Sequence, residues 1–400
     1  MASLNNMASP NNRETMMATA CDWLAGRQAE MVECLETLVN IDSNSYDKAG
    51  TDRVADVIVD WLEADGIEIL RTPRPDAGDI LEARLDGDGR DAGNGHVLMM
   101  GHRDTVFPTG TVATRGYTRD GDTAFGPGVA DMKSGLVLNI FVLRALKRLA
   151  PLPFPVRVLF TADEEIGSRD GTAFIRQAAS GARAVLNAEP GRISGNVVTG
   201  RKGGAAFLIE VTGRAAHSGV SHADGASAIE ALARKIVKLH ALTDYVAGVT
   251  TNVGLIEGGV SRNTVAPSAS AQLDTRFVTN AQREALLADI EAIVAEEDVV
   301  GTRATLTQTS GFLPMEPAMS DALFARYRAQ AARLGFEVDG EFTGGCSDAG
   351  TTASLGIPTL CGTGPVGAKM HTEAEYCRLE TFVPRAQAVA LTILDLAHQD

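Results

Sequence analysis

The sequence has few cysteines and no long apolar run, and each shortage excludes a class of protein. Its five cysteines are odd in number and never occur as Cys-x-x-Cys, which disfavours a disulfide framework and a thiolate zinc knuckle. No apolar run approaches the roughly 20 residues that span a bilayer. The N-terminal residues do not show the basic start and apolar block of a secretory signal. We therefore expect a reduced, cytoplasmic protein that does not contact membranes.

Basic residues are also scarce, because 36 Lys and Arg face 51 Asp and Glu for a net charge of −15. Such an acidic protein is a poor candidate for binding the phosphate backbone of nucleic acids. Hydrophobic residues make up 44% of the chain and charged residues 22%, which is typical of a globular protein with an ample core. The length of 400 residues favours two or three domains at about 150 residues each.

Strands and helices alternate in the first half of the chain. Short apolar runs predict buried strands over 96–101, 156–162 and 184–188, with a helix over 132–149. Residues 22–64 are expected to form two helices, after a loose polar tail over 1–15. This alternation predicts an α/β fold with a mainly parallel sheet flanked by helices.

The pattern changes after residue 200. A strand–helix–strand–strand–helix–strand order is predicted over 206–212, 226–242, 249–256, 268–277, 281–296 and 302–308. This order is close to a ferredoxin-like α/β sandwich. Helix, strand and helix patterns then resume over 323–334, 357–361 and 382–396. The sequence therefore suggests a domain over 1–200 and 312–400, interrupted by an inserted domain over 201–311.

Histidine and carboxylate side chains follow the predicted strands where each strand ends. Taken singly, each of these residues has an ordinary explanation. Asp131 could be the N-cap of a helix, and the acidic run at 163–165 could be a solvated turn. His371 could lie in a surface loop without binding a metal. Open α/β sheets place their sites at the carboxyl ends of the strands, so we expect the set to converge. Their nitrogen and oxygen atoms suit zinc, manganese or cobalt. The candidate ligands are His102, Asp131, Glu165, Glu189 and His371.

Two further carboxylates suggest the chemistry. Asp104 follows His102 by two residues and can accept its second ring N–H. Three ligand carboxylates, two divalent ions and a bridging hydroxide sum to zero charge. Such a centre polarises a carbonyl and acidifies bound water, and Glu164, adjacent to a ligand, can take the water's proton as general base. This predicts hydrolysis of an amide or a related carbon–nitrogen bond.

The sequence resembles the co-catalytic zinc hydrolases that include glutamate carboxypeptidases, aminoacylases, acetylornithine deacetylases and succinyl-diaminopimelate desuccinylases. The resemblance covers nearly the whole chain after about residue 20, and its first two motifs are most similar to the glutamate carboxypeptidase branch. The motifs are GHRDTVFP (101–108), GPGVADMKSG (126–135), TADEEIGS (161–168), AEPGR (188–192), GRAAHSGV (213–220), SRNTVAP (261–267), LDTRF (273–277), GGCSDA (344–349) and MHTEAEY (370–376).

The resemblance implies a role for each candidate ligand. His102 and Glu189 would hold one ion, Glu165 and His371 the other, and Asp131 would bridge both. Two zinc ions are expected, with manganese or cobalt as alternatives. The resemblance also implies that Asp104 orients His102, that Glu164 is the general base, and that the peptide bond after Asp131 is cis.

The inserted domain would serve as a lid and dimerisation module in such a family. His217, with His222 as a weaker candidate, would reach the partner subunit's site of a homodimer and stabilise the oxyanion there. Asn263 and Arg276 would hold a carboxylate or carbonyl of a small acidic substrate. Each of these roles has an ordinary alternative. His217 could be a histidine of a surface loop, and Arg276 could form a structural ion pair within its strand.

Some positions depart from the family pattern. The stretch 305–315 lacks the arginine that some glutamate-specific members use, and Lys369 and Met370 replace a more glycine-rich loop. Cys346 is a further candidate pocket residue or a small buried one. We predict a hydrolase of N-acyl amino acids or C-terminal glutamate-like dipeptides. Release of an amine from a small aromatic compound is the alternative, and Glu164 argues against a non-catalytic binding protein.

Overall fold

The computed structural model describes residues 10–90, 95–149 and 151–397. These residues divide into two compact units, each with its own sheet and core. The first unit contains the described residues up to 200, with 317–342 and those from 351 onward. The second unit contains 201–316 and 343–350. Residues 312–316 and 343–350 thus group with the second unit, outside the range 201–311 that the sequence suggested.

An eight-stranded sheet forms the centre of the first unit. Its strands in spatial order are β1 (Glu68–Thr72), β2 (Ile80–Leu85), β6 (Val156–Thr161), β3 (His96–His102), β7 (Ala182–Asn187), β14 (Thr359–Cys361), β8 (Val197–Arg201) and β13 (Gly340–Thr343). The middle strands β6, β3, β7 and β14 run parallel, whereas β1, β2 and β8 pair antiparallel. The predicted parallel sheet is therefore confirmed at its centre.

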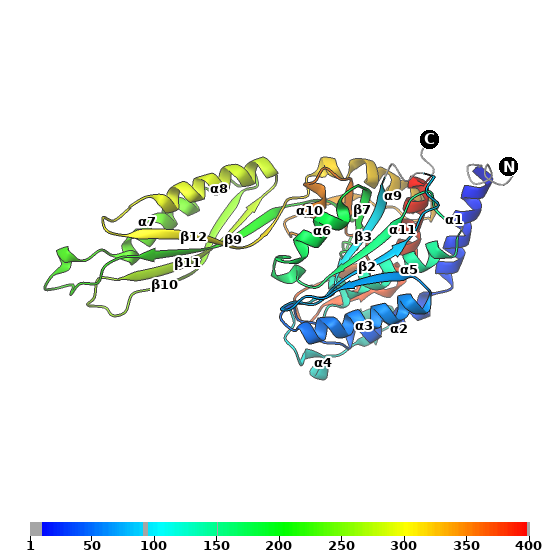
Figure 1. Ribbon diagram of the computed structural model, residues 1–400, viewed down its shortest axis with the longest axis horizontal. Helices are drawn as coiled ribbons and strands as arrows, with labels where there is room; N and C mark the ends of the chain where they lie inside the picture. Colours follow the sequence, from blue (N-terminus) through cyan, green and yellow to red (C-terminus); the bar gives the residue numbers. More distant parts are fainter. Residues whose placement is uncertain (1–9, 91–94, 150, 398–400) are drawn as a thin grey trace. The chain divides into compact units, whose positions relative to one another are not determined.

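Helices cover both faces of this sheet, as Figure 1 shows. The helices of this unit are α1 (Pro10–Ala25), α2 (Gln28–Val39), α3 (Lys48–Ala64), α4 (Thr111–Thr114), α5 (Ser134–Lys147), α6 (Gly171–Ala179), α9 (Asp321–Arg333) and α11 (Phe382–Leu396), while α10 (Ala349–Ala353) spans a boundary between the units. Side chains of β3 alternate between the two faces. Val97 and Met99 belong to the large core with α5 and α11, and Leu98 and Met100 pack with α6.

A small antiparallel sheet brings a late segment of the chain beside an early one. It consists of β15 (Gly367–Ala368), β16 (Tyr376–Arg378), β5 (Thr123–Phe125) and β4 (Thr118–Asp120). Tyr376 pairs with Phe125 in this sheet. The loop between β15 and β16, which carries His371, is thereby fixed close to the segment that leads to Asp131.

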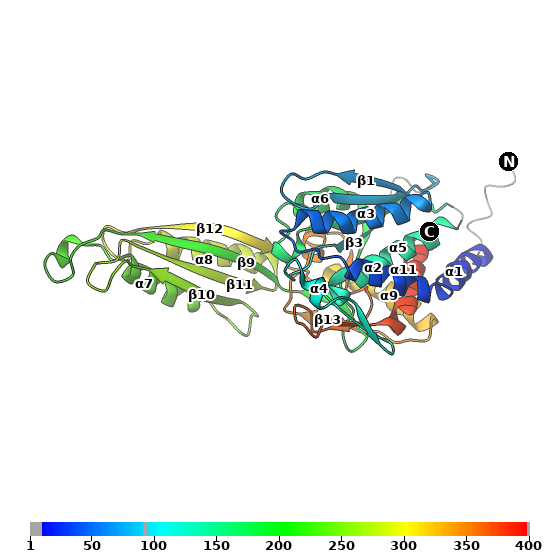
Figure 2. The ribbon, with the colours of Figure 1, turned by 90° about the horizontal axis from the view of Figure 1, so that it is seen from below.

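The second unit has the predicted strand and helix order. Its elements are β9 (Gly203–Thr212), α7 (Ala228–His240), β10 (Thr250–Gly258), β11 (Ser268–Phe277), α8 (Asn280–Ala295) and β12 (Arg303–Phe312). The strands form an antiparallel sheet in the order β10-β11-β9-β12, side by side in Figure 2. Phe207, Leu232 and Ile290 lie in the core between sheet and helices. The ferredoxin-like α/β sandwich is confirmed.

Two predictions for the first unit were incomplete. Residues 1–9 of the expected tail lie outside the described residues, but α1 already begins at Pro10, where a helix tolerates proline in its first turn. Met17, Ala20 and Leu24 of α1 are buried, and α1 packs on α11 and α5. Strands β1 and β2 were not predicted.

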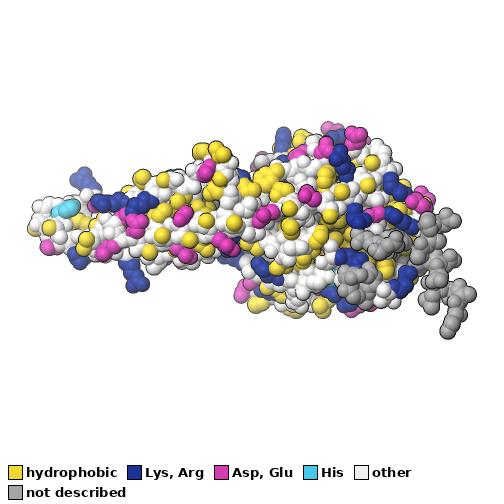
Figure 3. All heavy atoms as spheres, turned by 90° about the horizontal axis from the view of Figure 1, so that it is seen from above, with side chains coloured by type: hydrophobic (Ala, Val, Ile, Leu, Met, Phe, Trp, Pro, Cys, Tyr) yellow, Lys and Arg dark blue, Asp and Glu magenta, His cyan; other side chains and the backbone are white. Residues whose placement is uncertain are grey.

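The helices and the surface of the described residues reflect the composition of the chain. No helix among the described residues is long and apolar enough to cross a membrane. Basic and acidic side chains are intermixed on the face drawn in Figure 3. No disulfide bond joins the five cysteines, all of which lie among the described residues.

Candidate metal centre

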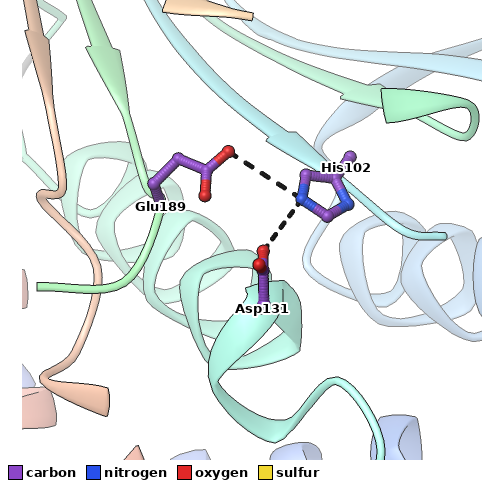
Figure 4. A group of neighbouring side chains, drawn as sticks. All are labelled: His102, Asp131 and Glu189. Atoms are coloured by element: carbon purple, nitrogen blue, oxygen red, sulfur yellow. Dashed lines mark hydrogen bonds and ion pairs between the residues drawn. The ribbon is translucent and has the colours of Figure 1, made fainter. Parts of the chain in front are cut away.

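His102, Asp131 and Glu189 converge at the carboxyl edge of the central sheet (Figure 4). His102 is the last residue of β3, and Glu189 follows β7. Asp131 lies in the kinked turn Val129–Lys133 before α5. The His102 Nε2 atom is 3.1 Å from Asp131 Oδ1 and 3.8 Å from Glu189 Oε1.

A second group shares Asp131. Glu165 lies in a 3₁₀ turn, Glu164–Ile166, after β6, and His371 lies in the loop between β15 and β16. The His371 Nε2 atom is 3.1 Å from Glu165 Oε2 and 3.5 Å from Asp131 Oδ2. The two oxygens of Asp131 therefore face different imidazoles, which is the arrangement expected of a bridging ligand.

The backbone around Asp131 explains how its side chain reaches the site. Asp131 has non-helical angles (φ −108°, ψ 94°), and its carboxylate faces the histidines, so the helix N-cap interpretation was wrong. The Asp131–Met132 peptide bond is cis, as the resemblance implied. Gly135, in the first turn of α5, lies so close to the strand end before Glu189 that a Cβ there would be 1.9 Å from Ala188 O. Glycine lets α5 approach that strand end.

Asp104 holds the acidic turn in addition to facing His102. Its buried carboxylate accepts hydrogen bonds from Ser45 Oγ (2.7 Å) and from the backbone N–H groups of Glu164 (3.2 Å) and Glu165 (3.1 Å). The His102 Nδ1 atom is 3.0 Å from the backbone oxygen of Asp104 but 3.4 Å from its carboxylate. The nearer acceptor for His102 is thus the backbone carbonyl, which sequence spacing did not reveal.

The charges of the cluster shift the pKa values of both histidines. Burial alone would lower the pKa of His102, but Asp104, Asp131 and the nearby Glu164 charge raise that pKa well above its usual value. Hydrogen bonds to Asp131 and Glu165 raise the pKa of His371 to about 10. Both shifts show that the surrounding carboxylates favour positive charge at this place.

Glu164 lies beside the two groups without belonging to either of them. It is buried, with 8% of its surface exposed, and its charge acts on His102. Among the described residues, the two groups that could hold a metal ion are His102 with Asp131 and Glu189, and Asp131 with Glu165 and His371.

The donor set fits a pair of divalent cations. Within each group the candidate ligand atoms all lie within 4.8 Å of one another. The donors are imidazole nitrogens and carboxylate oxygens, which suit zinc, manganese or cobalt. Four of the five side chains are at most 14% exposed, whereas His371 is 52% exposed, so the second group is the one that opens to solvent.

The residues predicted to contact the substrate all belong to the second unit. His217 and Asn263 are exposed, and their segments are joined by a hydrogen bond from Ser218 N to Asn263 O. Arg276 forms a two-point ion pair with Asp274, with both N–O distances 3.1 Å. It also donates a hydrogen bond to Cys346 Sγ at 2.9 Å. The structural ion pair is therefore present, and a contact of Arg276 with substrate stays a prediction.

Sequence reasoning missed two residues that support the centre. Ser45 binds Asp104, as described above, and Glu375 binds the backbone before Asp131. Glu375 lies in the motif MHTEAEY, but spacing alone does not show that its side chain turns inward while those of 371–374 stay exposed. Ser45 carries no recognisable pattern in the sequence.

Comparisons with known proteins find relatives along most of the chain. Carboxypeptidase G2 from Pseudomonas sp. (strain RS-16) is 27% identical over 381 residues, covering 92% of this chain and 90% of that protein. A putative succinyl-diaminopimelate desuccinylase DapE from Mycobacterium tuberculosis (strain ATCC 25618 / H37Rv) is 29% identical over 348 residues, covering 83% of this chain and 89% of that protein.

Solved structures share the fold. The M20 family metallo-carboxypeptidase Sso-CP2 from Sulfolobus solfataricus aligns with a TM-score of 0.74 and 17% identity, covering 92% of this chain and 99% of that chain. The family described as Peptidase family M20/M25/M40 matches residues 98–395, a span that includes all five candidate ligands. The chain therefore belongs to peptidase family M20/M25/M40 and is a hydrolase that acts on carbon–nitrogen amide bonds.

Proposed function

We propose that this chain is a metal-dependent hydrolase of N-acyl amino acids or of C-terminal, glutamate-like dipeptides. One observation carries the proposal: the two oxygens of Asp131 face the imidazoles of His102 and His371, beside the buried carboxylate of Glu164. This arrangement is what hydrolysis through two cations sharing one ligand requires.

Each side chain has a definite task in this proposal. His102 and Glu189 would hold one ion, Glu165 and His371 the other, and Asp131 would contact both. Zinc is the first candidate, with manganese and cobalt as alternatives. When bound, two such ions polarise the substrate carbonyl and acidify the attacking water.

Glu164 would move the proton. It would take a proton from the attacking water and deliver it to the leaving nitrogen. Asp104 would keep Glu164 in place, because its carboxylate accepts the backbone N–H of Glu164. His217 would stabilise the tetrahedral oxyanion.

The substrate class is supported by the relatives and by Arg276. The named relatives are a carboxypeptidase and a putative succinyl-diaminopimelate desuccinylase, and both names point to substrates that carry carboxylates. Arg276 offers a planar guanidinium suited to bidentate carboxylate binding, with Asp274 as its present partner. The named relatives do not favour the release of an amine from a small aromatic compound.

A hydrolysis panel tests the proposal. N-acyl-glutamates, other N-acyl amino acids, dipeptides ending in glutamate and small aromatic amines are incubated before chelation, after chelation, and after return of zinc, manganese or cobalt. We expect metal-dependent turnover of the acidic amides. Ammonia from the aromatic amines without amide turnover would favour the alternative, and inactivity across the amides would refute the proposal.

Glu164→Gln sharpens this test. The amide cannot act as a general base, so we expect kcat to fall about 10²–10⁴-fold. Because Glu164 is outside both ligand groups, metal content should stay at the wild-type value. Unchanged hydrolysis by a fully metal-loaded Glu164→Gln protein would contradict the role of this residue.

We also propose that the chain forms a homodimer through its second unit. Strand β10 lies at an edge of its sheet and exposes Leu255 and Ile256 (61% and 56%). An edge strand with exposed apolar side chains is suited to pairing with another chain. Sedimentation velocity should show a dimer at micromolar concentration, and a monomer throughout that range would overturn this proposal.

A further inference from the structure

The side chain of Glu375 is buried, although the residues just before it in the same loop are exposed. It follows His371 by four residues in the loop between β15 and β16. The intervening residues 372–374 are exposed, whereas Glu375 is fully buried, with 0% of its surface accessible. A carboxyl group is costly to bury unless its oxygens accept hydrogen bonds. Its partners therefore show what the burial achieves.

Those partners are three backbone N–H groups in the segment that carries Asp131. The Glu375 Oε1 atom accepts hydrogen bonds from the N–H groups of Ala130 and Asp131, both at 2.9 Å. The Oε2 atom accepts one from the N–H of Gly128 at 3.1 Å. These N–H groups lie in the turn that precedes α5, which begins at Ser134. One side chain thus fixes the turn that presents Asp131.

The same residue is tied to the loop that presents His371. The backbone N–H of Glu375 donates to Thr372 O at 3.2 Å, which closes a tight turn directly after His371. Glu375 therefore connects two ligands that lie far apart in the sequence. The His371 Nε2 and Asp131 Oδ2 atoms that it connects are 3.5 Å apart.

Asp104 provides a parallel on the other side of the site. It accepts the backbone N–H groups of Glu164 and Glu165, as Glu375 accepts those before Asp131. We propose that Glu375 is a positioning residue that sets the spacing of Asp131 and His371 and thereby the affinity and geometry of the second metal position. The inference rests on the proposed function, because it concerns the metal centre assigned there.

Glu375→Gln tests this role with little change in shape. A glutamine side chain keeps one acceptor oxygen and places an NH₂ group against at least one backbone N–H. We expect one of the two Co²⁺ or Zn²⁺ ions to bind about 10–100-fold more weakly, as is typical when a group that supports a ligand is lost. The visible absorption spectrum of the Co²⁺ protein should change, and kcat should fall more than KM rises.

The control is Glu373→Gln in the same loop, because the side chain of Glu373 is exposed. It should leave metal binding, spectrum and turnover at wild-type values. Glu375→Asp retains the charge with a shorter reach, so it should recover part of the lost affinity relative to Glu375→Gln. If Glu375→Gln does not fold, Glu375→Asp still tests the inference, because weakened binding of one ion is expected there as well.

The outcomes separate this inference from the proposed function. Glu375→Gln that is less stable, yet binds both ions with the wild-type affinity and Co²⁺ spectrum, would show a purely structural role and overturn the inference. The same holds for Glu375→Asp that binds both ions as the wild type does. A wild-type protein that binds no Co²⁺ or Zn²⁺ would instead overturn the proposed function, and the inference with it.

Discussion

Replacing Asp104 with asparagine would remove one acceptor oxygen from the carboxylate that holds the acidic turn. The Oδ1 atom accepts from Glu164 N, and Oδ2 accepts from Glu165 N and Ser45 Oγ. An asparagine NH₂ group must take one of these two places. In either orientation it faces a backbone N–H, so one buried donor of the turn loses its acceptor.

The size of the effect follows from these contacts. Leaving one buried N–H without an acceptor costs about 1–3 kcal/mol, which we expect as a loss in the free energy of unfolding. Metal affinity should fall by about 10–100-fold, the usual range for groups that support metal ligands. We place Asp104→Asn at the lower end of this range, because the backbone carbonyl of Asp104 still faces His102 Nδ1 at 3.0 Å.

Two measurements check this reasoning. Urea unfolding of the metal-free proteins gives the stability difference, and titration with Zn²⁺ gives the affinity. Ser45→Ala, which removes a single hydrogen bond to the same carboxylate, should show a smaller loss in both. Asp120→Asn, at an exposed position of β4, should change neither. Wild-type stability and affinity in Asp104→Asn would refute the role assigned to this carboxylate.

Two further predictions concern stability and the partner subunit. Burial would raise the pKa of Asp79, but hydrogen bonds from Lys48, a backbone N–H and Arg71 outweigh it and lower the pKa from 3.8 to about 2. This shift corresponds to about 2.4 kcal/mol, which we discount to about 1–2 kcal/mol because Lys48 and Arg71 are about one-third exposed. A lowered pKa stabilises the fold above about pH 4 and ceases to do so between pH 4 and pH 2. Asp79→Asn should therefore unfold at lower urea concentration at pH 7, with a deficit that shrinks below pH 4; a deficit independent of pH would contradict the assignment. His217→Ala should keep its metal content and lose about 10²–10³-fold in kcat, and dimers mixed with Glu164→Gln subunits should regain part of the activity unless His217 acts within its own subunit.

Three of the five candidate ligands could be predicted because each follows a strand whose sequence is unambiguous. The strands β3, β6 and β7 are short apolar runs, and their carboxyl ends share an edge in a parallel sheet. His102, Glu165 and Glu189 then meet at that edge. The βαββαβ order of the second unit was equally visible, since its strands and helices differ in apolar period.

Other parts of the fold carry weaker signals. Strands β1 and β2 include charged residues and pair antiparallel at the sheet edge, so they lack the continuous apolar run of a central strand. Helix α1 is polar over its first residues, and the packing of Met17 and Leu24 against the core stabilises it rather than its composition. Strands β1 and β2 and helix α1 are stabilised by tertiary contacts, and such contacts cannot be read from a single sequence.

The supporting groups show why the sequence reveals ligands more readily than the residues that position them. The candidate ligands are recognised by residue type, as histidines and carboxylates. A supporting residue needs an acceptor that reaches a backbone N–H, and this reach depends on loop conformation. Asp104 and Glu375 meet this need by accepting from backbone N–H groups. Neutral donors satisfy these oxygens without adding a full positive charge beside the ligands. A lysine or arginine in the place of these donors would compete electrostatically with the cations, so support by backbone N–H groups preserves the attraction that the centre needs.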